Sequence, residues 1–80
     1  MTLSEAIITR ILTLCHERNI SPNKLCTISG ITQSTLNNIL NGRNKSTTVS
    51  TIKKLCDGLD ITLEEFFGSE PFQNLEQEVK

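Results

Sequence analysis

Amide and hydroxyl side chains gather in a short stretch between residues 33 and 41. At about 100° per residue they fall within an arc of about 140° on a helix, opposite the apolar Leu36, Ile39 and Leu40. A planar amide carries a donor and an acceptor that match the N7 and N6 edge of adenine, and a hydroxyl can donate or accept. This stretch, called the amide face below, has the chemistry of base readout; it consists of Gln33, Ser34, Asn37, Asn38 and Asn41.

An exposed helix can carry such residues merely to stay soluble. Asn is a poor helix former, however, and the adjacent pair Asn37 and Asn38 needs another reason. The segment from Arg18 to Cys56 also holds six basic residues and no acid. Because a carboxylate there would repel a phosphate backbone, this composition favours nucleic acid as the partner.

The net charge of −1 hides a division along the chain. Residues 1–56 hold seven Lys and Arg against two acids, whereas residues 57–80 hold one Lys against seven acids. We therefore expect a helical domain over residues 1–68 and an acidic tail over residues 69–80. The spacing of Phe72, Leu75 and Val79 leaves two alternatives for the tail, which can fray in solvent or dock on a neighbour.

Capping signals and apolar spacing predict the helices that position the amide face. A capping box of Thr2 and Glu5 begins a helix from Leu3 to about Arg18. The N-cap Ser21 and the following Pro22 begin a second helix. It should stop at Ser29 and Gly30, where glycine can adopt the left-handed conformation.

Three further N-cap signals complete the expected all-α chain. Thr32 begins the helix with the amide face, which ends at Asn41 and Gly42. Thr48 begins the next helix, whose apolar face should turn inward; that face consists of Val49, Ile52, Leu55, Cys56 and Leu59. A second capping box, Thr62 and Glu65, begins a short last helix that presents Leu63, Phe66 and Phe67 to the core.

Composition excludes several classes of protein. Eighty residues form one domain with a small core and no deep enclosed cavity. The apolar residues between Ile7 and Leu14 are interrupted by Thr9, Arg10 and Thr13, so neither a signal peptide nor a membrane span is expected. We expect a cytoplasmic protein with no membrane partner.

Cys15, Cys26 and Cys56 are odd in number, widely spaced and at apolar helical positions, which indicates reduced core residues rather than metal ligands or redox sensors. His16 follows Cys15, but consecutive helical residues point apart, so a nucleophile pair is disfavoured. The chain shows no paired carboxylates, glycine-rich phosphate loop or metal-ligand spacing. We expect no enzyme activity, no cofactor and no small-molecule substrate.

Residues from about Arg10 to Phe67 resemble the helix-turn-helix domain of the phage-repressor and Cro family, often called the Xre family. The resemblance is carried by Leu25-Cys26, Gly30-Ile31-Thr32-Gln33-Ser34, Leu36, Ile39, Asn41-Gly42, Ile52, Leu55, Leu59 and Ile61-Thr62-Leu63-Glu64-Glu65-Phe66. It implies a compact five-helix, lambda-repressor-like fold in which the third helix recognises operator DNA. Asp60 departs from the family pattern, because a glycine is usual after the fourth helix.

The resemblance also implies which residues contact DNA. The side chains expected at base edges are Gln33, Ser34, Thr35, Asn37 and Asn38. Those expected at phosphates lie at the start of the second helix and after the third; they are Ser21, Asn23, Arg43, Asn44 and Lys45.

These observations predict a sequence-specific DNA-binding transcriptional regulator, a repressor that occupies a palindromic operator on double-stranded DNA as a homodimer. Phe66, Phe67 and the tail are candidates for the dimer contact, and burial of both rings within one monomer is the alternative. Because fold does not fix function, a second class stays open. In that class the helix-turn-helix is a protein-interaction module, such as an antitoxin or adaptor, with little DNA binding of its own.

Overall fold

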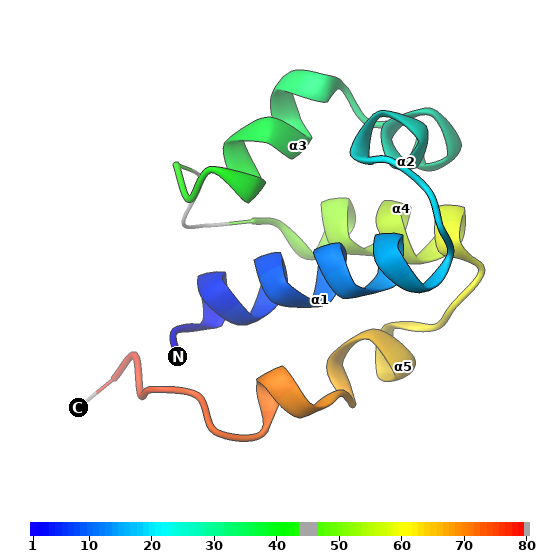
Figure 1. Ribbon diagram of the computed structural model, residues 1–80. Helices are drawn as coiled ribbons and strands as arrows, with labels where there is room; N and C mark the ends of the chain where they lie inside the picture. The colour runs from blue at the N-terminus through cyan, green and yellow to red at the C-terminus, as the bar shows by residue number, and fades with distance from the viewer. Residues whose placement is uncertain (44–46, 80) are drawn as a thin grey trace.

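The computed structural model describes residues 1–43 and 47–79, and within these ranges every regular element is helical (Figure 1). The elements are α1 (Leu3–Glu17), α2 (Pro22–Ser29), α3 (Gln33–Leu40), α4 (Val49–Leu59), α5 (Leu63–Phe67) and the 3₁₀ turn η1 (Glu70–Phe72). The predicted all-α fold of five α-helices is confirmed.

Hydroxyl side chains start all five α-helices, as the sequence predicts. Each N-cap oxygen accepts a hydrogen bond from the backbone N–H three residues later, in a first turn that has no carbonyl partner for its donors. In α1 and α5 a glutamate completes the capping box by accepting from the N-cap N–H. The caps are Thr2, Ser21, Thr32, Thr48 and Thr62.

Left-handed residues follow four of the helices, and the first of them is Asn19 after α1, with φ 53°. Gly30 after α2 has φ 69° and Gly42 after α3 has φ 72°, a conformation that only glycine adopts without strain. Asp60 follows α4 with φ 57°. Asp is among the few other residues that tolerate this region, so the departure from the usual glycine does not prevent the turn.

The core draws on every α-helix and lies between α1, α2 and α4. Its largest fully buried side chains are Phe66, Ile11, Leu25, Leu36, Ile52, Leu55 and Cys56. The closest helix contact is between α2 and α4, where a Cβ added to Gly58 would lie 2.4 Å from Ser29 Oγ and 2.9 Å from the Ile28 carbonyl oxygen. Gly58 therefore lets the two helices approach more closely than a side chain would.

Two arginines join distant parts of this core. Arg10 of α1 donates from Nε to the Phe66 carbonyl at 3.0 Å and from Nη2 to the Glu65 carbonyl at 2.9 Å. Arg18 donates from Nη1 to the Leu59 carbonyl at 2.9 Å. Both guanidinium groups thus satisfy carbonyls near the C-terminal ends of α5 and α4, where a positive charge is favourable.

Burial of the three cysteines within the core confirms their structural interpretation. Burial raises the pKa of the Cys15, Cys26 and Cys56 thiols. A raised pKa keeps a thiol protonated at neutral pH, and the protonated form is neither a nucleophile nor a metal ligand.

The prediction that Val49 turns inward is wrong, because its side chain is 67% exposed. Val49 is the first residue of α4, whose buried residues begin only at Ile52. At the other end of the fold, Phe66 is fully buried while Phe67 is 37% exposed. Phe66 is therefore a core residue of the monomer and is unsuited to a dimer contact.

The segment after α5 packs on its own chain. Phe67 and Phe72 form an edge-to-face pair with ring centroids 5.0 Å apart, and η1 contacts α1. Further along, the Glu76 N–H donates to the Met1 carbonyl at 3.0 Å, and the terminal amine lies 4.0 Å from the Glu76 carboxylate. Residues 70–76 thus lie against the N-terminal half of α1.

Candidate nucleic-acid interface

The third helix lies at one edge of the molecule, opposite α5 and the C-terminal segment (Figure 1). Leu36 and Ile39 on its back are 1% and 2% exposed and hold it on the core. On its front Gln33, Ser34 and Asn37 are exposed, as is Asn41 at its C-cap. The packed back and open front predicted from the helical period are both present.

Two of the predicted base-contacting residues are half-buried. The Thr35 hydroxyl shares a 2.9 Å hydrogen bond with the Thr32 hydroxyl, which also accepts the Thr35 N–H at 3.1 Å. Thr35 therefore reinforces the N-cap of α3. Asn38 is also half-buried, and its backbone carbonyl accepts the Arg43 N–H at 3.0 Å.

The turn after α3 fixes where Arg43 leaves the helix. The Gly42 N–H donates to the Ile39 carbonyl at 3.1 Å, beside the bond from Arg43 to Asn38. These paired bonds and the left-handed glycine form a Schellman-type ending. The turn places an exposed guanidinium-bearing residue directly beyond the amide face, whereas the predicted phosphate contacts Asn44 and Lys45 lie outside the described residues.

The start of α2 offers donors to an anion. The Ser21 oxygen accepts the Lys24 N–H at 3.1 Å, which leaves the hydroxyl proton of Ser21 to donate elsewhere. Pro22 has no N–H, so Asn23 contributes the next backbone donor of the first turn, and its side chain is exposed. Partial positive charge at a helix N-terminus suits a phosphate oxygen.

The turn between α2 and α3 fixes these two ends relative to each other. The Cys26 carbonyl accepts both the Gly30 N–H at 3.0 Å and the Ile31 N–H at 3.2 Å, while the Cys26 thiol lies 3.8 Å from the Thr32 carbonyl. A short, hydrogen-bonded turn between two packed helices is the geometry of a helix-turn-helix.

The basic residues of the acid-free segment divide into two groups. Arg18 is bound to the Leu59 carbonyl, and Lys53 forms an ion pair with Asp57 one turn along α4. Lys24, Arg43 and Lys54 are exposed and form no ion pair within the part of the chain that the structure describes. These three cations remain for an external anion.

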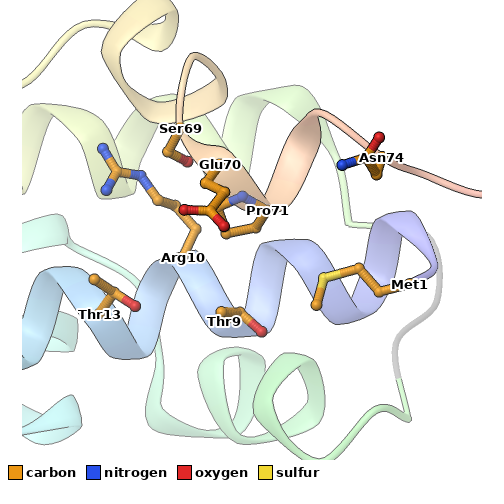
Figure 2. Close-up of a pocket in the computed structure, with 8 residues that line it drawn as sticks. All are labelled: Met1, Thr9, Arg10, Thr13, Ser69, Glu70, Pro71 and Asn74. Carbon is orange, nitrogen blue, oxygen red and sulfur yellow. The ribbon is translucent and has the colours of Figure 1, made fainter.

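A hollow of about 590 Å³ lies on the other side of α1, between that helix and residues 69–74. Figure 2 shows Arg10 extending from α1 toward Ser69 and Glu70 at this hollow, with Met1 at one end. The Arg10 guanidinium donates hydrogen bonds to carbonyls of α5, and no α3 residue lines the hollow. The hollow is therefore separate from the amide face.

Residues 1–43 and 47–79 contain no group of three or more His, Cys, Asp and Glu side chains placed to hold a metal ion. None of the helices described is both long and apolar enough to cross a membrane.

Two packed helices joined by a tight turn, the second of them with an exposed polar front, define a helix-turn-helix DNA-binding domain. The family model described as the Cro/C1-type HTH DNA-binding domain matches residues 10–71. The crystal structure of the prophage Lp1 protein 11 superposes with a TM-score of 0.82 and 32% identity, covering 94% of this chain and 99% of that chain. No curated protein matches. The chain belongs to the Cro/C1-type helix-turn-helix family, which confirms the resemblance drawn from its motifs.

Proposed function

We propose that the chain is a sequence-specific repressor that binds a palindromic operator as a homodimer, with α3 in the major groove. The observation that carries this proposal is the exposed amide face on a helix whose back is buried. A rigid helix that presents donors and acceptors outward is the element that helix-turn-helix proteins place in the major groove, which is wide enough to admit it.

Phosphate contacts would set the register of α3. Arg43 lies beyond one end of the amide face, and Ser21 and Asn23 lie at the N-terminus of the preceding helix. Asn44 and Lys45 extend the basic turn in sequence. Contacts of this kind orient a protein on the duplex without carrying sequence information, which leaves discrimination to Gln33 and its neighbours on α3.

A dimer would place two copies of α3 in successive major grooves. Half-sites would then be spaced by about 34 Å, one helical turn of DNA, and related by approximate two-fold symmetry. Repression follows from occupancy, since a protein bound over a promoter excludes polymerase without further chemistry. The likeness to a prophage protein supports a regulator of this kind, which would act on DNA in the cytoplasm.

Gel-shift titration of two variants tests the proposal. Asn37→Ala should reduce the preference for the operator over random DNA by about tenfold to a hundredfold, because it removes one base contact. Arg43→Ala should weaken binding to both DNAs by a similar factor, because it removes a phosphate contact. Thr13→Ala is the control, since Thr13 is exposed on α1 and lines the hollow that is separate from the amide face.

The competing class predicts a different result. If the helix-turn-helix were a protein-interaction module, neither variant would alter DNA binding, which would already be weak and unspecific. Sedimentation of the chain with and without operator DNA tests the dimer separately, and a one-to-one complex on a palindromic site would contradict it.

A further inference from the structure

We infer that α3 specifies its half-site through A·T base pairs, with Gln33 and Asn37 as the residues that read adenine. The inference rests on the proposed function and adds the class of DNA sequence to it.

Gln33 and Asn37 stand one turn apart on the exposed front of α3. Residues at i and i+4 are neighbours on a helix surface, so the two amides address adjacent positions of a groove. Each amide oxygen can accept a hydrogen bond from the N6–H₂ group of adenine while the amide NH₂ group donates to N7, the bidentate pattern that distinguishes adenine from the other bases. None of the described hydrogen bonds engages either side chain, so both amides are available to DNA.

The arginines of the chain all lie outside α3. Guanine is read chiefly by Arg or Lys bound to O6 and N7, and α3 contains neither. Arg10 and Arg18 are held by carbonyls at the ends of α5 and α4. Arg43 follows the left-handed Gly42, beyond the last turn of α3, where a phosphate role is expected.

The remaining polar residues of α3 contribute less discrimination. The Thr35 hydroxyl is bound to Thr32, so we assign it to positioning the first turn of α3 rather than to base contact. A serine hydroxyl such as that of Ser34 can donate or accept and pairs with any base. Asn38 is half-buried, so the specificity of the helix falls on the two exposed amides, Gln33 and Asn37.

Selection of bound duplexes from a random DNA pool by the full chain tests the inference first. Two half-sites should emerge in which the fixed positions are A or T, and positions with G or C should vary. Asn37→Ala and Gln33→Ala should each relax one A·T position. Thr13→Ala, the truncation of an exposed α1 residue that lines the hollow away from the amide face, should leave the selected sequence unchanged.

A base analogue then tests the atomic contact. Replacement of one adenine by 7-deazaadenine removes the N7 acceptor and keeps Watson–Crick pairing. At the position that Asn37 reads, it should weaken binding of the natural chain by about tenfold to a hundredfold. The Asn37→Ala variant should bind the modified and the unmodified DNA equally well, because its contact with N7 is already lost.

Half-sites fixed by invariant guanines, or a 7-deazaadenine effect that persists undiminished in Asn37→Ala, would overturn the inference while leaving the proposed function intact. If no sequence is enriched and binding is insensitive to salt, the proposed function itself fails. Circular dichroism of each variant separates loss of contact from loss of fold.

Discussion

The two faces of α3 differ in burial and in polarity, although neighbouring residues of the sequence belong to opposite faces. Leu36 is 1% exposed and packs in the core, whereas Asn37 beside it is open to solvent. The helix packs on α1 and α2, and Gln33, Ser34 and Asn37 on its front are exposed. Stability and sequence recognition are thus carried by different side chains of one short helix, which makes them separable by mutation.

The arginines likewise divide into residues that stabilise the fold and a residue that is exposed. Arg10 and Arg18 reach carbonyls at the ends of distant helices and act within the fold. Arg43 is exposed, and only its backbone N–H is bound, to Asn38. Identical side chains therefore serve the scaffold in two places and remain available to an outside partner in the third.

Removal of the buried anchor of α3 should have the largest effect. Leu36→Ala should lower the free energy of unfolding by about 2–5 kcal/mol, because a buried leucine loses its contacts and leaves a cavity. Urea denaturation monitored by circular dichroism measures the change. Val49→Ala is the control, since that side chain is 67% exposed, and it should change stability by less than about 0.5 kcal/mol. Equal effects from the two changes would contradict the packing described.

Gly58→Ala should come next, with a loss of about 1–3 kcal/mol, because the new methyl group would press on Ser29 Oγ and the Ile28 carbonyl. Ser29→Ala should by itself be neutral or slightly stabilising, since the buried Ser29 hydroxyl has no hydrogen-bond partner among the described residues. Combined with Gly58→Ala it should recover part of the loss. Thermal unfolding of all three variants checks this, and additive losses would refute the close α2–α4 contact.

Arg18→Ala and Arg43→Ala should have opposite consequences. Loss of the Arg18 bond to the Leu59 carbonyl should lower stability by about 1 kcal/mol and leave the salt dependence of DNA binding unchanged. Arg43→Ala should leave stability within about 0.5 kcal/mol of the original. It should instead reduce the slope of log K against log salt by about 1. A stability loss in both variants would erase the distinction between the two arginines.

The smallest expected effect is the loss of stability that follows protonation of Glu5 in acid. The Glu5 carboxylate accepts the Thr2 N–H at 2.7 Å, and this backbone bond lowers the pKa of Glu5. Because the folded pKa lies below the unfolded one, the stabilisation is present above the unfolded pKa and is lost as pH falls through the folded value. NMR titration of the Glu5 side chain measures the shift. An ordinary or raised pKa would show that the capping box does not form in solution.

Local chemistry explains why so much of the fold was predictable. An N-cap hydroxyl and the N–H that it binds lie three residues apart, so all five helix starts follow from short sequence patterns. The open front of α3 likewise follows from its helical period. The engagement of Thr35 by Thr32 is equally local, and the hydroxyl pair at an N-cap and three residues later could have indicated it.

The features that sequence did not predict depend on distant partners. Arg10 and Arg18 bond to carbonyls 56 and 41 residues away, and no periodicity links such positions. The exposure of Val49 depends on tertiary packing, which buries α4 residues only from Ile52 onward. The packing of η1 on α1 brings together the two ends of the chain. The roles of the amide face toward DNA stay predictions, because they depend on a partner rather than on the chain.

The salt dependence of operator binding tests the DNA-binding role of this chain most directly. A dimer that neutralises about six phosphates with residues such as Arg43 should give a slope of log K against log salt near −5. A slope near zero would contradict it, because a protein that displaces no counterions does not rest on the phosphate backbone.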